Sequence, residues 1–202
     1  IIGTAGFTAA ESVQKLEQAG MTPQSGPVLV TGATGGVGSV AIKLLAQLGY
    51  EVTAVTGKAE KVDWIKMLGA TSVITREEAL EGNNKPMLPE KWGGVVDTVG
   101  GDILFNGVKS LRYGCSLAAC GLVASPTFGA SVLPFILRHV NLLGIDSVNL
   151  PIQQKTAIWE RLSSEWLMDL SDLEEVLTME KLSDSIDRIL TGKMVGRGVL
   201  HL

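Results

Sequence analysis

The sequence predicts an α/β fold, in which helices cover both faces of a doubly wound parallel sheet of six strands. Two observations support this prediction. Short runs that are apolar throughout, as in strands buried on both faces, alternate with segments of helical periodicity. A glycine-rich turn follows the first of these runs, and sheets of this kind bind ligands outside the carboxyl ends of their strands.

In the first half of the chain, the expected helices end at recognisable signals. A helix is expected over residues 4–19, because alanine and aliphatic residues recur on one face and Gly20 follows. The strands expected next are residues 28–31, 51–56 and 72–75. The helices between them are expected over residues 37–48 and 59–68, each followed by a glycine.

The second half continues this alternation after a polar stretch, residues 81–91, which is expected to be a loop because it holds two asparagines and two prolines. Asp102 is the expected N-cap of a helix over residues 102–111. Strands are expected at residues 94–97, 115–120 and 140–147, with a short helix at 132–138. The tail over residues 153–190 is expected to be mostly helical, and residues 198–202 to form a last strand.

The composition is that of one folded domain without a nucleic-acid or membrane partner. The 202 residues are 46% hydrophobic and 19% charged, which suffices for a sizeable core. The net charge of −4 gives no basic excess, and no apolar run reaches the roughly 18 residues of a membrane span. Cys115 and Cys120 are spaced neither as a disulfide framework nor as zinc ligands, so both are expected to be buried thiols in a cytoplasmic protein.

The glycine-rich turn is the central motif, running from Val30 to Gly38 between the first strand and the next helix. Glycines let the backbone approach a pyrophosphate closely, and the free N–H groups at the start of the helix then bind the anion. The motif therefore predicts a dinucleotide site in a Rossmann fold, with a merely connecting turn as the alternative. A P-loop is excluded, because Ser39 follows Gly38 where that motif needs lysine.

The residues after the second expected strand indicate which dinucleotide would bind. NAD-binding domains place Asp or Glu there for the ribose hydroxyls, but this chain reads Thr56-Gly57-Lys58, with Lys61 one helical turn later. A hydroxyl, backbone N–H groups and lysines suit a 2′-phosphate, which a carboxylate would repel. NADPH is therefore the predicted cofactor, unless the two lysines are only a solvated helix face. The missing acid also argues against an S-adenosylmethionine-dependent methyltransferase.

Two dehydrogenase families share this kind of turn. The short-chain family needs a catalytic Tyr-x-x-x-Lys, which neither Tyr50 nor Tyr113 provides. The chain instead resembles the medium-chain dehydrogenase/reductase superfamily, in its zinc-free quinone oxidoreductase branch, through residues 3–10, 32–38, 68–70 and 95–101. Three further segments look like the acryloyl-CoA reductase group of that branch, namely residues 118–122, 134–138 and 143–148.

This resemblance implies that residues 1–202 are the NADP-binding domain of a larger enzyme. A GroES-like substrate domain would precede Ile1, and residues 198–202 would be a strand returning toward it. The implied reaction is hydride transfer from NADPH to an α,β-unsaturated carbonyl, acyl-CoA or quinone acceptor, with little turnover by this part alone. The sequence names no catalytic residue, no metal is expected, and a non-catalytic NADPH-sensing module is the alternative function.

The resemblance also assigns the cofactor-binding residues. The pyrophosphate would be held by Thr34, Gly35, Gly36 and Val37. The 2′-phosphate would be held by Thr56, Gly57, Lys58 and Lys61. The adenosine half would lie beside Thr98, and the nicotinamide half would be bordered by Gly121, Leu122 and Ser147. The sixth strand would pair with its copy in a homodimer, which would cover an apolar edge.

Five polar residues have both a functional and a structural interpretation. Asp97 ends a buried strand, where capping of the next turn is favoured over contact with the cofactor. Arg138 and Arg197 are candidates for CoA or phosphate contacts, or else are exposed salt-bridge partners. His139 and His201 have no companions at metal-ligand spacing.

Overall fold

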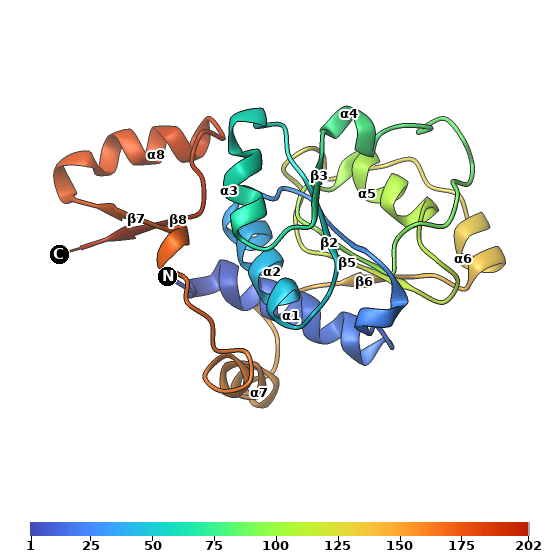
Figure 1. The fold of residues 1–202 in the computed structure, drawn as a ribbon, viewed down its shortest axis with the longest axis horizontal. Coiled ribbons are helices and arrows are strands. Elements are labelled where there is room, and N and C mark those ends of the chain that lie inside the picture. Colours follow the sequence, from blue (N-terminus) through green and yellow to red (C-terminus); the bar gives the residue numbers. More distant parts are fainter. Residues whose placement is uncertain (202) are drawn as a thin grey trace.

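The computed structural model describes residues 1–201 and contains one six-stranded sheet with a small two-stranded sheet beside it (Figure 1). The six strands are all parallel, in the order β3-β2-β1-β4-β5-β6. They are β1 (Val28–Val30), β2 (Val52–Val55), β3 (Ser72–Ile74), β4 (Gly94–Asp97), β5 (Ser116–Ala119) and β6 (Asn141–Gly144). The strand order reverses between β1 and β4, which is where doubly wound sheets bind ligands. The predicted fold class is confirmed.

Helices cover both faces of the main sheet, as predicted. One apolar core lies under α1 (Gly3–Gln18), α2 (Gly36–Gln47), α3 (Val62–Met67) and α7 (Ile152–Leu162). A second core on the other face lies under α4 (Arg76–Ala79), α5 (Gly101–Lys109) and α6 (Leu133–Arg138). Short 3-10 helices occur at Pro23–Ser25, Ala59–Lys61, Ser171–Leu173 and Met179–Lys181. No helix within residues 1–201 combines the length and the apolar character that crossing a membrane requires.

Helix α5 begins one residue earlier than predicted, and Asp102 is not its N-cap. The N-cap is Gly100, whose φ of 70° lies in the left-handed region. The N–H of Gly100 donates to the buried carboxylate of Asp97 at 2.7 Å, so Asp97 holds the turn instead. Asp102 lies in the first turn of the helix, where its carboxylate accepts a hydrogen bond from Asn83 Nδ2.

The C-terminal tail contains a strand that the sequence pattern did not predict. Strand β7 (Glu174–Leu177) precedes α8 (Leu182–Leu190) and pairs in parallel with β8 (Arg197–Leu200). The two strands meet through a helical crossover, and a run of four residues shows no periodicity that would reveal this pairing. In Figure 1, β7, β8 and α8 stand to one side of the main sheet. The predicted last strand begins one residue early, at Arg197, and residue 202 lies outside the described residues.

Strands β5 and β6 are shorter than predicted. β6 ends at Gly144, and the carboxylate of Asp146 then accepts hydrogen bonds from the N–H groups of Val148 and Asn149, which turns the chain. Cys115 and Cys120 flank β5 and are half-buried free thiols, so the expectation that both lie buried in the strand is wrong. Burial raises the pKa of Cys120 to about 11, and its Sγ donates to the carbonyl oxygen of Asp97.

Candidate functional site

The glycine-rich turn joins β1 to α2 and leaves the start of α2 without a side-chain cap. Gly35 is the N-cap, so no side chain occupies the first N–H groups of the helix. Gly32 has a φ of 61°, and a Cβ there would lie 2.2 Å from Thr98 Oγ1. A Cβ on Gly38 would lie 2.3 Å from the carbonyl oxygen of Gly32. Both positions therefore need glycine, which lets α2 begin close against the end of β1.

Arg197 lies over the first residue of α2. Its Nη1 is 2.6 Å from the position that a Cβ on Gly36 would take, and its Nε donates to the carbonyl oxygen of Ile1. Burial lowers the pKa of this guanidinium, which still keeps its charge at neutral pH. Within residues 1–201, Arg197 forms no ion pair, and its guanidinium lies at the start of α2.

The chain segment that precedes β8 is fastened to the same turn. The N–H of Gly196 donates to the carbonyl oxygen of Thr34 at 3.0 Å. Thr34 is buried, and Val37 in the first turn of α2 is half-buried. The predicted pyrophosphate site is therefore bounded by residues that lie far apart in the sequence.

Thr56, Gly57 and Lys58 follow the end of β2, one strand away from the glycine-rich turn. Thr56 is buried, and its Oγ1 accepts a hydrogen bond from the N–H of Lys58 at 3.0 Å. Lys58 Nζ donates to the carbonyl oxygen of Met194 at 2.9 Å. The ammonium group of Lys58 thus ties the end of β2 to the segment that leads into β8.

Several positive charges gather around Lys58. Burial is the main reason why the pKa of Lys58 is lowered; the carboxylate of Glu60 opposes this shift, and Lys61, Arg76 and Arg188 add to it. The N–H of Lys61 donates to the carbonyl oxygen of Lys58 at 3.0 Å, and the Lys61 ammonium group forms no ion pair within residues 1–201. The local excess of cations suits a doubly charged anion such as a phosphate monoester.

A cavity of about 140 Å³ connects the turn with the end of β2. It lies at the carboxyl ends of β1, β2 and β4, where the fold predicts the ligand. Its polar residues include Thr34, Thr56, Gly57 and Arg76. Arg76 was missed by the sequence analysis, although its position directly after the third expected strand was a signal, because that strand ends at the same edge of the sheet.

Thr98, predicted to lie beside the adenosine half, is tied to the end of β1. Its N–H donates to Thr31 Oγ1 at 2.9 Å, and its Oγ1 donates to the carbonyl oxygen of Thr31 at 2.9 Å. Thr31 Oγ1 in turn donates to Asp97 Oδ1 at 2.8 Å. Burial raises the pKa of Asp97, although the hydrogen bonds that its carboxylate accepts act to lower this pKa. The structural interpretation of Asp97 is the one that these contacts support.

The residues predicted to border the nicotinamide half lie at the ends of β5 and β6. Gly121 and Leu122 line a cavity of about 270 Å³, together with Gly100 and Ile145. A Cβ on Gly121 would lie 1.9 Å from the carbonyl oxygen of Thr98, so only glycine is possible there. Ser147 does not line this cavity; its Oγ accepts a hydrogen bond from Thr8 Oγ1 of α1 at 2.9 Å.

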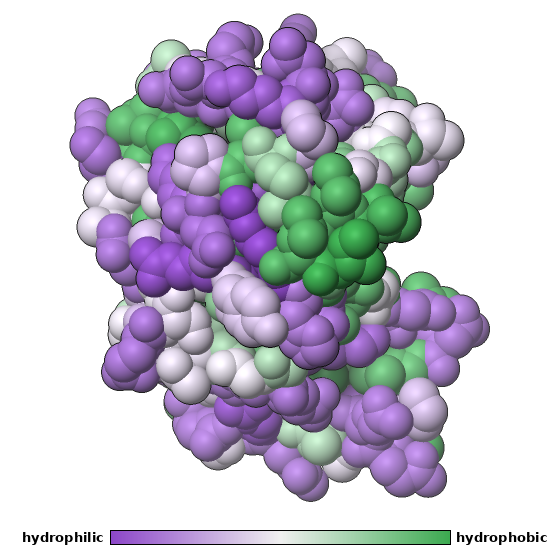
Figure 2. Space-filling model, turned by 90° about the vertical axis from the view of Figure 1, so that its right-hand side faces the viewer, coloured by the Kyte–Doolittle hydropathy of each residue, from purple (hydrophilic) through white to green (hydrophobic). Residues whose placement is uncertain are grey.

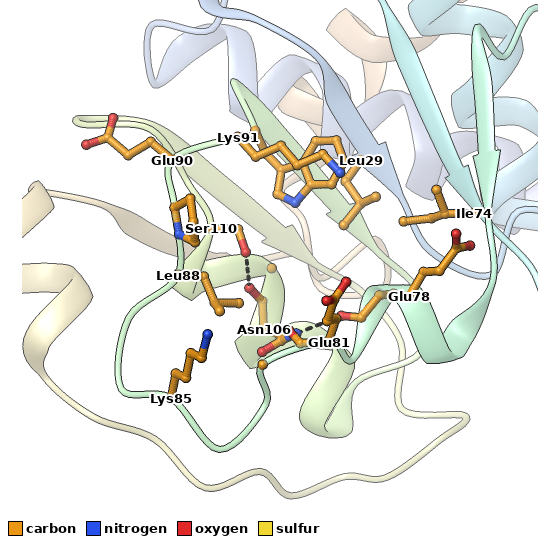
Figure 3. A pocket seen from close by; sticks show the side chains of 15 residues that line it. Leu29, Ile74, Glu78, Glu81, Lys85, Leu88, Glu90, Lys91, Asn106 and Ser110 are labelled. Carbon is orange, nitrogen blue, oxygen red and sulfur yellow. Dashed lines mark hydrogen bonds between the residues drawn. The ribbon is translucent and has the colours of Figure 1, made fainter.

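A separate cavity of about 410 Å³ lies under the loop of residues 81–91 (Figure 3). Figure 3 shows Leu29 and Ile74 on its sheet side and Lys85 and Leu88 on its loop side. None of the predicted cofactor-binding residues lines it. Its greater volume therefore does not identify it as the dinucleotide site.

Arg138 is held by protein groups near this loop. Its guanidinium donates to the carbonyl oxygens of Leu88, at 2.6 Å, and Lys109, at 2.9 Å, and lies 3.6 Å from the carboxylate of Glu90. Arg138 therefore stabilises the loop, and these contacts favour its structural interpretation. Within residues 1–201, no three His, Cys, Asp or Glu side chains are grouped so that they could hold a metal ion.

Known proteins provide close matches to the chain. Residues 36–164 match the zinc-binding dehydrogenase family. Acrylyl-CoA reductase AcuI of Ruegeria pomeroyi is 48% identical over 205 residues, which cover 100% of this chain and 61% of that protein. Putative quinone oxidoreductase YhfP of Bacillus subtilis is 45% identical over 204 residues, which cover 100% of this chain and 62% of that protein.

Solved structures confirm the fold of the cofactor-binding part. Escherichia coli YhdH, crystallised with bound NADPH, superposes with a TM-score of 0.94 at 39% identity and covers 98% of this chain and 61% of its own. YhfP, crystallised with bound NAD, superposes with a TM-score of 0.95 at 45% identity and covers 99% of this chain and 61% of its own.

The chain thus spans about 60% of the length of these relatives. The shared part includes the glycine-rich turn, the parallel sheet and the β7–β8 pair. The chain therefore belongs to the zinc-binding dehydrogenase family of the medium-chain dehydrogenase/reductase superfamily and corresponds to the dinucleotide-binding part of its quinone oxidoreductase and acrylyl-CoA reductase members.

Proposed function

We propose that this chain is the NADPH-binding domain of a larger reductase that transfers hydride to an α,β-unsaturated carbonyl, acyl-CoA or quinone acceptor. The observation that carries the proposal is the cavity between the glycine-rich turn and Thr56–Gly57, which is flanked by cations at the carboxyl ends of parallel strands. Two relatives support this function. AcuI is named an acrylyl-CoA reductase, and YhdH was crystallised with NADPH.

The residues of the turn suit a pyrophosphate. A Cβ on Gly35 would lie 3.2 Å from the carbonyl oxygen of Gly32, a tight contact, so glycine lets the turn close on itself. The first N–H groups of α2 have no side-chain cap, and the helix dipole adds positive potential at the same point. Thr34, Gly35, Gly36 and Val37 would hold the two phosphates, with Arg197 as a further cation.

The end of β2 suits a 2′-phosphate. Thr56, Gly57, Lys58 and Lys61 would supply a hydroxyl, backbone N–H groups and ammonium groups. Thr98 would border the adenosine half, and Gly121, Leu122 and Ser147 the nicotinamide half. When bound, the reduced nicotinamide supplies a hydride, and these residues orient the ring against the acceptor. A GroES-like domain preceding Ile1, to which residues 198–202 would return, would complete the substrate pocket.

We also propose a homodimer formed through β6. β6 is an edge strand of the main sheet, and its Leu142 is partly exposed. Val132, Ile136 and Leu137, in and next to α6, are exposed apolar residues, and Figure 2, which views this end of the molecule, shows an apolar patch. Pairing of β6 with its copy would continue the sheet and cover part of this surface.

Two further parts of the proposal concern metal and compartment. Resemblance of residues 118–122, 134–138 and 143–148 to the zinc-free branch supports a reaction without zinc. Cys115 and Cys120 are both free thiols, which is consistent with a reducing, cytoplasmic location.

Calorimetric titration of the chain with NADPH and, in parallel, with NADH tests the cofactor. We expect NADPH to bind at least about 10-fold more tightly, because ion pairs with a 2′-phosphate are charge-assisted. Equal or tighter binding of NADH would overturn the choice of cofactor. A folded chain that binds neither dinucleotide would contradict the assignment of the site.

A further inference from the structure

The loop of residues 81–91 is held against α5 by buried polar contacts, although it contains no helix or strand. Nζ of the buried Lys109 donates to the carbonyl oxygens of Asn83, at 2.8 Å, and Lys85, at 3.2 Å. The N–H of Leu88 donates to the carbonyl oxygen of Lys109 at 3.2 Å. These bonds keep the loop in place over the cavity of about 410 Å³ (Figure 3).

Asn106 of α5 brings a hydrogen-bond acceptor without a partner to this cavity. The residue is 3% exposed and lines the cavity. Its Nδ2 donates to the carbonyl oxygens of Ala79, at 2.8 Å, and Glu81, at 3.1 Å, which fixes the orientation of the amide. Its Oδ1 is buried and accepts no hydrogen bond within residues 1–201. A buried acceptor without a partner is unfavourable, so a ligand that donates to Oδ1 would be stabilised.

The walls of the cavity are largely apolar. Leu29 and Ile74 lie on the sheet side, Leu88 lies on the loop side, and the buried Trp92 adds an aromatic ring. Aromatic molecules pack well against such a ring, either edge-to-face or offset. The volume falls within the roughly 300–1,000 Å³ of small-molecule sites. The cavity therefore suits a compact aromatic body.

The charges around the cavity favour an uncharged ligand. The ionisable residues of the lining are Glu78, Glu81, Glu90, Lys85 and Lys91. Three carboxylates against two ammonium groups disfavour an anion such as a phosphate or a carboxylate. The carboxylates of Glu78 and Glu90 already accept hydrogen bonds from backbone N–H groups. Nζ of Lys91 lies 4.3 Å from the ring centre of Trp92, so this charge is engaged as well.

We propose that this cavity is a second binding site, for a small uncharged aromatic molecule with one N–H or O–H donor. The donor binds Asn106 Oδ1, and the ring packs among Leu29, Ile74 and Trp92. None of the predicted cofactor-binding residues lines the cavity, so this binding does not require a dinucleotide. Indole is the matching probe, because it is flat and has a single N–H group. N-methylindole has the same ring system without the donor.

NMR titration of the isotope-labelled chain with indole and with N-methylindole tests the donor. We expect indole to bind in a 1:1 ratio with a dissociation constant of about 1 mM or tighter, which is reasonable for so small a probe. N-methylindole should bind about 10-fold more weakly, because it leaves Asn106 Oδ1 without a donor. Comparing the two probes leaves Asn106 itself, and its bonds to the loop, unaltered.

Two substitutions that fill the cavity test its location. Ala79→Leu adds apolar volume from α4, and Leu88→Trp adds it from the loop. Each should weaken indole binding at least about 10-fold, because the ring loses its space. The control is Ala130→Leu, which adds the same side chain at an exposed residue outside the cavity and should leave indole binding unchanged.

Thermal melts show which variants are folded, and either filled variant alone is enough for the comparison. Failure of indole to saturate the chain in the millimolar range would overturn the inference. Equal affinities for indole and N-methylindole would overturn it as well, because Asn106 Oδ1 would then not be the acceptor. Full indole affinity in a folded Ala79→Leu or Leu88→Trp variant would mean that the probe binds elsewhere.

Discussion

The N–H of Gly196 donates to the carbonyl oxygen of Thr34 at 3.0 Å, which joins the segment before β8 to the glycine-rich turn. Gly196 has a φ of 68°, and a Cβ there would lie 2.4 Å from the carbonyl oxygen of Leu173. The hydrogen bond of Gly196 therefore connects the β7–β8 unit to the candidate pyrophosphate site.

The substitution Gly196→Ala tests the close packing of Gly196 against the backbone of Leu173. Gly192 has the same φ of 68° but nothing within 4 Å of its Cβ position, so Gly192→Ala is a matched control. The control should lose about 1 kcal/mol of unfolding free energy from backbone strain. Gly196→Ala should lose more, by about 1–3 kcal/mol, because its Cβ also collides with backbone. Denaturant titration measures both, and equal losses would contradict the contact.

Gly38→Ala should disrupt the glycine-rich turn. The new Cβ would lie 2.3 Å from the carbonyl oxygen of Gly32, so α2 must move away from β1. We expect NADPH affinity to fall at least about 10-fold and the melting temperature to fall as well. Gly129→Ala is the control, because nothing lies within 4 Å of its Cβ position. Unchanged NADPH binding by a folded Gly38→Ala variant would contradict the site.

Asp97 should contribute to stability in a pH-dependent way. Burial raises its pKa in the folded state above 3.8, so the folded protein binds this proton more tightly than the unfolded chain does. Asp97 therefore contributes most to the free energy of unfolding at pH values below its pKa in the unfolded chain. This contribution is lost as the pH rises through its pKa in the folded protein. The difference in unfolding free energy between the unaltered chain and Asp97→Asn should shrink as pH rises through this window. Chemical denaturation at a series of pH values measures it, and a difference that grows with pH would refute the assignment.

Cys120 should react slowly with alkylating reagents at neutral pH. Burial raises its pKa from 9.0 to about 11, so only about a thousandth of it is thiolate at pH 8. In a Cys115→Ser variant, the rate of alkylation by iodoacetamide should keep rising with pH until about 11. Mass spectrometry follows the reaction in the folded protein. A rate that levels off near pH 9 would mean that the thiol is less buried than its contact with Asp97 implies.

The proposed dimer predicts the effect of a charge on β6. Leu142→Lys should abolish association, because a lysine on an edge strand opposes pairing with a second copy. Leu167→Lys places the same charge on an exposed leucine outside β6 and should leave the assembly unchanged. Sedimentation velocity reports the size of each species. A monomeric unaltered chain, or a Leu142→Lys dimer, would contradict the proposal.

Local patterns in the sequence determined the order and type of most elements of the main sheet. Fully apolar runs identified β1, β2 and β4, since strands covered on both faces show no polar side. The glycine-rich turn predicted where α2 starts. The absence of an acidic residue after β2 led to the prediction of NADPH, whose 2′-phosphate an acid would repel. These features act over a few neighbouring residues, so the one-dimensional pattern is enough to read them.

The tertiary structure alone decided which distant residues meet. Strand β7 could not be predicted from its four residues, because its parallel partner is supplied by β8 after a helical crossover. Asp97, not Asp102, holds the start of α5, since the buried carboxylate reaches the N–H of Gly100 across the turn. Arg76 reaches Gly57 only because β3 lies beside β2, and Arg197 reaches Gly36 only because the tail folds back onto α2. Such contacts depend on the spatial order of strands, which residue spacing does not encode.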